Sequence, residues 1–195
     1  MILWTIQSPA AVAALEREGI LVANSGMPDP LYRPAFQWMA RQMSQRLGSR
    51  PRHSRPLWAR RVWDSSHPRP DLRQSGHLPP GQRGARIEFV ADPACVLLSD
   101  FDLWHYVLNY WYLPTSTRDD AAFEALVMAA GLSFDMKPLP DSHLHSRIEA
   151  SWDRIFDLNT FIKDITRRRA KRSIQATFWS LPMNAVRDVT WFTAR

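Results

Sequence analysis

The stretch SIQATFWSLPMNAV, residues 173–186, decides how the C-terminal part of this chain joins a sheet. Its apolar run predicts a strand, and the residues PMNA that follow predict a short turn. The last stretch, RDVTWFTA, predicts a second strand, and we expect both to join the sheet of the opening strand. A glutamine, Gln175, stands inside the first of these strands. It either bonds across the sheet, as most buried polar groups do, or serves a ligand.

The opening of the chain predicts a strand, a helix and a strand. The residues ILWTIQ alternate, which places Leu3 and Thr5 on the same face of a strand. Ser8 is expected to cap a helix that has Pro9 at its first position and ends at Gly19.

Helices dominate the middle of the chain. PAFQWMARQMSQRLG carries apolar side chains three and four residues apart, and DDAAFEALVMAAG and SRIEASWDRIFDL predict two more helices. In LSDFDLWHYVLNYWYLP, Ser99 is expected to cap a helix, with Asp102 completing a capping box and Pro114 ending it. The sequence thus predicts an α+β fold, with strands at both termini forming a mixed or antiparallel sheet around a central helical group.

Composition excludes several classes of protein. The 195 residues suit one domain, 1–195, and 45% hydrophobic residues with nine tryptophans exclude a disordered chain. One cysteine, Cys95, cannot form an intramolecular disulfide, which favours a cytoplasmic location. No window reaches the roughly 18 apolar residues of a membrane span, so we expect no membrane partner. The sequence leaves the oligomeric state open.

Residues 49–84 predict a long loop rich in arginine and proline, with one short strand at PLWARRVW. Eleven arginines fall between Arg41 and Arg86, and Trp58, Trp63 and His67 lie among them. A second basic run, ITRRRAKRS, covers 165–173. Such a platform suits a nucleotide or nucleic acid. The alternative is a solvated loop in an arginine-biased proteome, because only three of the 25 basic residues are lysine. After this loop, ARIEFV and ACVLL predict two strands joined by a tight ADP turn.

Several enzyme classes lack their motifs in this chain, which has no Gly-rich phosphate loop, HExxH, paired CxxC or GxSxG. His143 and His145, with Asp141, resemble a metal cluster, but flanking proline and serine favour a loop there, and no metal is expected. His105 lies three residues after Asp102 in a predicted helix, where a structural role is favoured over acid–base work.

The motifs LWTIQ, RIEF, LLSDFDLWHYVLNYWYLP, IQATFWSLP and FTAR closely resemble the bacterial domain-of-unknown-function family 3841. The similarity covers nearly the whole chain. It implies one intact domain and little about activity.

A more distant resemblance concerns function. The order of a strand with a polar residue, a helix ending in glycine, and a late strand followed by LPxxAV is similar to small bacterial ADP-ribosyltransferase domains. In that family a first-strand polar group meets the NAD ribose, an aromatic or hydroxyl group cradles nicotinamide, and a late strand supplies an acidic or amide residue. Loss of nicotinamide leaves an oxocarbenium-like ribose, which such groups orient and stabilise.

The resemblance implies a set of site residues. Gln175 would occupy the late-strand position, and Glu88 is the nearest strand carboxylate; both are candidate catalytic residues. Candidate cofactor-binding residues are Thr5, Gln7, Trp58, Tyr106, Arg60 and Arg61. Glutamine stands where active transferases mostly have glutamate, and Glu88 can equally be a surface strand residue paired with an arginine.

Two functions follow from these observations. The first is binding of an NAD-type nucleotide, with NAD as a substrate rather than a tightly bound cofactor, by a domain that transfers ADP-ribose to a protein or nucleic acid. The alternative is a non-catalytic module that binds nucleic acid or a protein partner through its basic loop.

Overall fold

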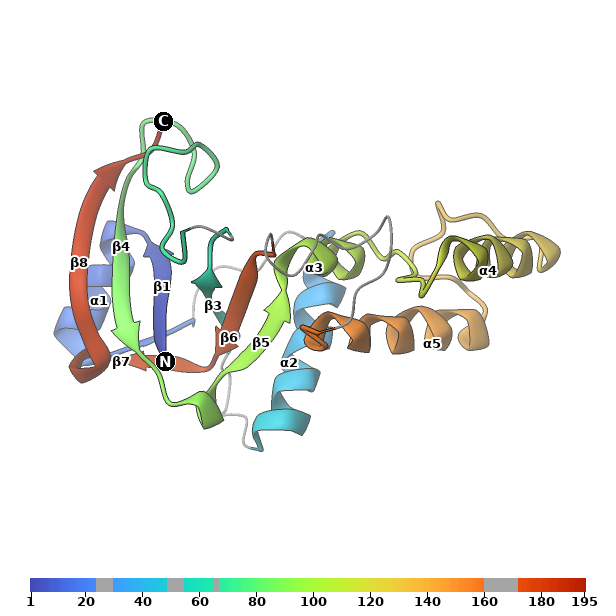
Figure 1. Ribbon diagram of the computed structural model, residues 1–195, viewed down its shortest axis with the longest axis horizontal. Coiled ribbons are helices and arrows are strands. Elements are labelled where there is room, and N and C mark those ends of the chain that lie inside the picture. Colours follow the sequence, from blue (N-terminus) through green and yellow to red (C-terminus); the bar gives the residue numbers. More distant parts are fainter. Residues whose placement is uncertain (24–29, 49–54, 65–66, 160–171) are drawn as a thin grey trace. The chain divides into compact units, whose positions relative to one another are not determined.

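A computed structural model describes residues 1–23, 30–48, 55–64, 67–159 and 172–195 of the chain (Figure 1). It confirms the α+β class, with helices and a mostly antiparallel six-stranded sheet. The chain forms two compact units. Unit 1 consists of residues Met1–Leu98 and Ser173–Arg195, and unit 2 of residues Ser99–Arg172. The single-domain organisation expected from the sequence stays a prediction.

The described strands are β1 (Ile2–Gln7), β2 (Ile20–Val22), β3 (Leu57–Val62), β4 (Arg83–Val90), β5 (Leu97–Asp100), β6 (Ile174–Phe178), β7 (Ser180–Pro182) and β8 (Val186–Thr193). Six of them form one sheet in the order β5-β6-β3-β1-β4-β8, and β2 pairs with β7. Four adjacent pairs in this row are antiparallel: β6–β3, β3–β1, β1–β4 and β4–β8. Strands from both ends of the chain therefore share one sheet, as predicted.

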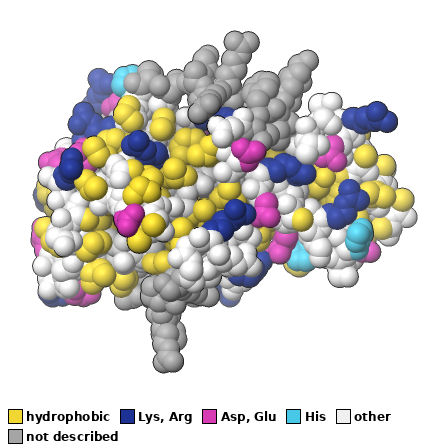
Figure 2. Space-filling model, turned by 60° about the horizontal axis from the view of Figure 1, so that its bottom comes forward, with side chains coloured by type: hydrophobic (Ala, Val, Ile, Leu, Met, Phe, Trp, Pro, Cys, Tyr) yellow, Lys and Arg dark blue, Asp and Glu magenta, His cyan; other side chains and the backbone are white. Residues whose placement is uncertain are grey.

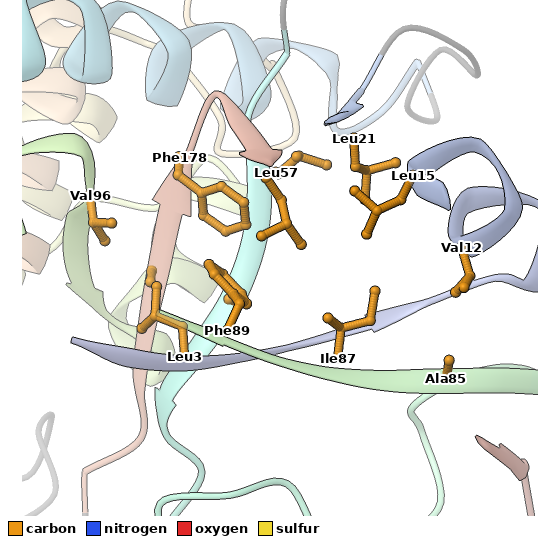
Figure 3. Close-up of a cluster of buried hydrophobic side chains, with 13 residues drawn as sticks. Leu3, Val12, Leu15, Leu21, Leu57, Ala85, Ile87, Phe89, Val96 and Phe178 are labelled. Carbon is orange, nitrogen blue, oxygen red and sulfur yellow. The ribbon is translucent and has the colours of Figure 1, made fainter. Parts of the chain in front are cut away.

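One face of this sheet, called the core face, is covered by apolar side chains (Figure 3). The cluster consists of Leu3, Val12, Leu15, Leu21, Leu57, Ala59, Ala85, Ile87, Phe89, Val96, Ala176, Phe178 and Leu181. Helix α1 (Pro9–Glu18) brings Val12 and Leu15 onto β4, and the short β2–β7 pair brings Leu21 and Leu181. Burial of this apolar area is the main stabilising term of unit 1.

The opposite face of the sheet, called the polar face, meets helix α2 (Arg33–Leu47). The ring of Phe36 lies edge-on to that of Trp58, with centroids 5.6 Å apart. The buried hydroxyl of Thr177 on β6 lies 3.8 Å from the sulfur of Met39. Side chains alternate between the faces of a strand, so Gln175 and Thr177 share the polar face while Ala176 and Phe178 face the core.

The first helix confirms its sequence signals. The Ser8 hydroxyl accepts the amide N–H of Ala11 at 3.2 Å. Gly19 ends the helix in the left-handed conformation, with φ of 71°, and its N–H donates to the carbonyl of Leu15. Both caps satisfy backbone groups that a helix leaves without partners.

The strands after the arginine-rich segment differ from expectation in one respect. ARIEFV lies in β4, as predicted, but the 3-10 turn η1 (Pro93–Cys95) begins at the end of the expected ADP turn and takes in Ala94 and Cys95, which were expected in the next strand; β5 begins at Leu97. Its cap is Asp92, whose Oδ1 accepts the N–H of Ala94 at 2.9 Å. β4 and β5 do not pair, because β1, β3 and β6 lie between them. In the final segment a 3-10 turn, η4 (Met183–Ala185), takes the place of the turn expected at PMNA.

Unit 2 contains α3 (Phe101–Leu108), α4 (Thr117–Ala129), α5 (Ser142–Ser151) and the 3-10 helix η2 (Trp152–Phe156). The capping prediction for α3 was wrong: Ser99 lies in β5, and Asp100 is the cap, with Oδ1 accepting the N–H groups of Asp102 and Leu103 at 2.9 and 3.1 Å. An Asp one residue closer to the helix competes better because its carboxylate also favours the positive end of the helix dipole.

The end of α3 was also predicted too late. The helix ends at Leu108, well before Pro114, because Tyr110 adopts φ of 58°. The N–H of Trp111 donates to the carbonyl of Tyr106, and the N–H of Tyr110 to that of Val107. This is a Schellman ending, with a tyrosine at the position that glycine usually occupies.

The segment around the paired histidines is helical, so the loop expected there was wrong. Asp141 caps α5, its Oδ1 accepting the N–H of Leu144 at 2.8 Å, which places His143 and His145 in the first turn. The aspartate is a stronger local signal for a helix start than the neighbouring proline is for a loop. The helix predicted over SRIEASWDRIFDL continues after Ser151 as η2.

Candidate functional site

Four side chains form a row across the polar face of the sheet. Gln175 on β6 lies directly opposite Arg60 on β3, Arg60 opposite Trp4 on β1, and Trp4 opposite Glu88 on β4. Opposed residues in an antiparallel sheet share a face and lie within side-chain reach. The register thus brings Gln175, Arg60 and Glu88, three of the residues named from the sequence, onto one row, with Trp4 between them.

The contact between β1 and β3 is a break in the sheet's backbone ladder. Of their described residues, only Trp4 and Arg60 pair in register, whereas β1 and β4 pair at six positions. Side chains bond to the backbone on both sides of this pair. The Thr5 hydroxyl donates to the carbonyl of Trp58 at 2.8 Å, and an Arg61 guanidinium N–H donates to the carbonyl of Ile2 at 3.2 Å. β1 and β3 are therefore joined by side chains where a regular ladder would use amides.

Gln7 completes this junction. Its amide Nε2 donates to the Thr5 hydroxyl at 2.7 Å, so that oxygen accepts one hydrogen bond and donates another. Thr5 is buried and lies on the core face, opposite Ile87. Thr5, Gln7 and Arg61 therefore shape the break between the strands, whereas Arg60 and Gln175 lie on the polar face beside it.

Arg60 and Trp58 supply charge and aromatic surface on the polar face. Both are half-buried. The guanidinium carbon of Arg60 lies 5.0 Å from the ring centroid of Trp63, a cation–π distance. A guanidinium held against an aromatic ring has a restricted orientation, and guanidinium groups match the geometry of a phosphate.

Gln175 and Glu88 lie too far apart to act on one ribose. Strands β3 and β1 lie between the strand of Gln175 and the strand of Glu88. Three inter-strand spacings therefore put the backbones of the two residues about 14 Å apart. Glu88 also accepts the indole N–H of Trp4 at 2.8 Å. Gln175 is 3% exposed, and its burial means that a ligand can reach its amide only where the neighbouring side chains leave room.

Tyr106 and His105 lie in unit 2, on α3, whereas the other named site residues belong to unit 1. Burial, and secondarily the charge of Asp120, raises the pKa of the Tyr106 phenol. The His105 ring bonds through Nδ1 to the carbonyl of Phe101 at 3.1 Å, so the ring contacts the backbone of its own helix.

The described arginines between 41 and 86 are distributed over several elements. Arg41 and Arg46 lie on α2, Arg60 and Arg61 on β3, and Arg83 and Arg86 on β4. Arg50 and Arg52, with most of the 165–173 run, fall outside the described residues. On the side of the molecule drawn in Figure 2, the visible Lys and Arg side chains are dispersed among apolar and uncharged groups.

Arg86 and Arg73 bond to neighbouring protein groups. Arg86 is buried and donates to the carbonyl of Pro70 at 2.9 Å and to the Thr190 hydroxyl at 3.2 Å; burial is the main cause that lowers the pKa of its guanidinium. The Arg73 guanidinium bonds to Asp71 and holds the pKa of that carboxyl well below its usual range. Arg60 remains the arginine of β3 that faces the candidate site.

Unit 2 contains a second polar cluster that sequence reasoning missed. The Tyr110 hydroxyl lies 2.5 Å from Nδ1 of His145 and accepts the N–H of Leu139 at 3.1 Å. Nε2 of His145 faces Glu149 at 3.9 Å. Within the described part of the chain no three His, Cys, Asp or Glu residues form a group that could hold a metal. No sequence signal marks Tyr110, because glycine is the usual residue where it stands.

Comparison with known proteins gives one match. No curated protein and no solved structure matches the chain. In the described parts of the chain, no helix is long and apolar enough to cross a membrane. The model of a family described as a domain of unknown function (DUF3841) matches residues 2–187. The match spans the motifs from LWTIQ to IQATFWSLP, and the chain belongs to DUF3841.

Proposed function

We propose that unit 1 binds a nucleotide of the NAD type on the polar face of its sheet, next to the break between β1 and β3. One observation carries the proposal: the register places Arg60 directly between Gln175 and Trp4, with Trp58 two residues away on the same face. A diphosphate needs a fixed guanidinium, a ribose needs an amide or carboxylate, and a base or nicotinamide ring needs an aromatic wall. These three groups are neighbours here.

Each named residue has a part in this proposal. The guanidinium of Arg60 binds a phosphate oxygen, the ring of Trp58 stacks on the nicotinamide or adenine, and the amide of Gln175 orients a ribose hydroxyl. Thr5, Gln7 and Arg61 hold the two strands together beside this face. Binding is the part the geometry supports best, because an amide cannot neutralise an oxocarbenium ion and Glu88 lies about 14 Å away.

Glycosyl transfer is the second question about the same site. In that reaction the bond between ribose C1′ and the nicotinamide nitrogen breaks, nicotinamide leaves with the electron pair, and an acceptor nucleophile bonds to C1′. The acceptor would be a protein or a nucleic acid. Release of nicotinamide from NAD, measured against a no-protein control, separates a transferase from a protein that only binds the nucleotide.

The first experiment is thermal unfolding of the full chain with NAD, ADP-ribose and nicotinamide at millimolar concentration. A ligand that binds only the folded state raises the midpoint, with about 2.7 kcal/mol of added stability at a hundredfold excess over its dissociation constant. We expect NAD and ADP-ribose to raise the unfolding midpoint of the wild type. Arg60→Gln and Gln175→Ala should each show a smaller shift, which corresponds to an apparent affinity at least tenfold weaker.

The matched control is Arg83→Gln. Arg83 also stacks on a tryptophan, with its guanidinium carbon 4.7 Å from the Trp191 ring centroid, but lies on β4 away from the row. It should keep the NAD shift. The proposal would be contradicted by two results together. The first is that none of the three ligands shifts the midpoint, and the second is salt-sensitive binding to a long polyanion that Arg60→Gln leaves unchanged. These results would favour a module that binds nucleic acid through its basic segment.

A further inference from the structure

Unit 1 contains a pocket on the other side of its sheet. It has a volume of about 370 Å³, within the range typical of small-molecule sites. Its walls include Phe89 at the end of β4, Phe178 and Trp179 at the end of β6, and Leu181 on β7. All four are buried, and the first two rings pack with centroids 5.2 Å apart (Figure 3). The pocket is therefore rigid and mainly apolar.

Few polar groups meet this pocket, and they restrict its occupant. Among the described lining side chains only Asp92 carries a formal charge, which disfavours an anion, and its Oδ1 already accepts the N–H of Ala94. Trp179 is 8% exposed and its indole nitrogen is almost wholly enclosed, so the ring contributes apolar surface to this wall.

We propose that this pocket binds a compact, uncharged and mainly apolar small molecule, such as an aromatic ketone. The apolar walls bury the body of the molecule. This second site is separate from the proposed nucleotide site, since Phe178 and Phe89 face the core and Arg60 and Gln175 face the other way.

Cys95 makes the pocket directly testable. It is the single cysteine of the chain, it is exposed, and it lines the pocket. Alkylation of the protein by iodoacetamide therefore reports on this place alone. An occupied pocket shields the thiol, so bound ligand should slow its alkylation.

The probe is 6-propionyl-2-dimethylaminonaphthalene, a neutral aromatic ketone whose emission shifts to the blue in apolar surroundings. With the full-length wild type we expect saturable binding in the micromolar range and slowing of Cys95 alkylation over the same concentrations. Ala185→Phe should fill part of the pocket and weaken binding at least tenfold. Ala13→Phe, at an exposed position of α1, should bind as the wild type does.

Three results would overturn the proposal. One is blue-shifted emission that does not saturate, the second is an alkylation rate at Cys95 that the probe leaves unchanged, and the third is equal binding by the wild type and a folded Ala185→Phe variant. Circular dichroism establishes that each variant is folded. The alkylation experiment uses the wild type alone, so it decides the question even where a variant fails to fold. NAD shifts measured on Ala185→Phe should equal those of the wild type, which keeps the two sites distinct.

Discussion

Single side chains in this protein take positions that local preference would give to other residues. Tyr110 adopts a left-handed backbone conformation that costs an L-residue about 1 kcal/mol relative to glycine. Its hydroxyl bonds to His145 and Leu139, and its ring packs edge-on to Trp152 with centroids 5.8 Å apart. These contacts, made between α3, α5 and the segment before α5, offset the backbone cost.

Removing this hydroxyl tests its contribution. Tyr110→Phe keeps the ring and should lower the free energy of unfolding by about 1–2 kcal/mol, because the N–H of Leu139 and Nδ1 of His145 lose their partner. Urea denaturation at pH 7 measures the change. Tyr106→Phe, in the last turn of α3, should stay within about 0.5 kcal/mol of the wild type. Equal effects of the two variants would contradict a specific role for the Tyr110 hydroxyl.

The Thr5 hydroxyl joins two strands that lack a continuous backbone ladder. Thr5→Val removes it while keeping the side-chain shape, leaving the buried carbonyl of Trp58 and the amide of Gln7 without this partner. We expect a loss of about 1–3 kcal/mol in unfolding free energy, measured by denaturant unfolding. Thr5→Ser, which keeps the oxygen, should recover most of that loss. A valine variant as stable as the wild type would show that the hydroxyl does not hold β1 to β3.

At the scale of elements, the start of α4 depends on a carboxylate. The Ser116 hydroxyl caps the helix, and Asp119 accepts hydrogen bonds from the N–H and hydroxyl of Thr115 and from the hydroxyl of Tyr112. The backbone N–H of Thr115 is the main cause that lowers the pKa of the Asp119 carboxyl. Its neighbour Asp120 has its pKa raised, mainly by burial and then by Glu124.

These opposite shifts predict opposite pH dependence. The lowered pKa of Asp119 means that its charge stabilises the fold above the unfolded value, near pH 4, and that this is lost as pH falls through the folded pKa. Asp119→Asn should therefore destabilise at pH 7, by about 1 kcal/mol, with a smaller difference at pH 3. Urea unfolding across this range measures it.

Asp120→Asn serves as the matched control. The raised pKa of Asp120 means that its ionised form costs stability above the folded pKa. Its substitution should leave the protein equally or more stable at pH 7, and the difference should vanish in acid. If both variants lose stability at neutral pH in the same way, the two carboxylates do not differ as the hydrogen bonds indicate.

At the scale of the whole molecule, a buried ion pair links the two ends of unit 2. Nε of Arg172 lies 3.6 Å from Oδ2 of Asp100, and both side chains are almost fully buried. Arg172 also donates to the carbonyl of Leu158 at 2.9 Å. Burial raises the pKa of Asp100, and the backbone N–H of Leu103 and the charge of Arg172 oppose that shift. The chain thus enters and leaves unit 2 at one desolvated contact.

A double-mutant cycle tests this contact. Arg172→Met leaves the Asp100 carboxylate buried without its cation and should cost about 3–5 kcal/mol of unfolding free energy. Asp100→Asn keeps an oxygen to cap α3, so the double variant Asp100→Asn with Arg172→Met should be more stable than Arg172→Met alone. Chemical denaturation of all four proteins gives the coupling energy. Additive losses would show that the two side chains contribute independently.

The sequence by itself determined the elements whose signals are local. β1, β3, β4 and α2 lie where alternation, spacing and caps predict them, because backbone hydrogen bonding and side-chain periodicity act over a few residues. The predicted cap of α3, Ser99, was one residue too early, because Asp100 is the cap. The sequence also predicted that Gln175 and Arg60 lie in strands, but it did not indicate that these two strands are neighbours.

Only the tertiary structure decided which residues meet. Strand order and register put Gln175 beside Arg60 and separate it from Glu88, a choice set by long-range packing of the core face rather than by any local signal. The same packing places a tyrosine in a left-handed turn and buries a charge pair, since contacts between distant segments offset costs that local preference would avoid. Local propensity determined where most strands and helices lie along the chain. Burial of one face of the sheet determined which side chains meet at the candidate site.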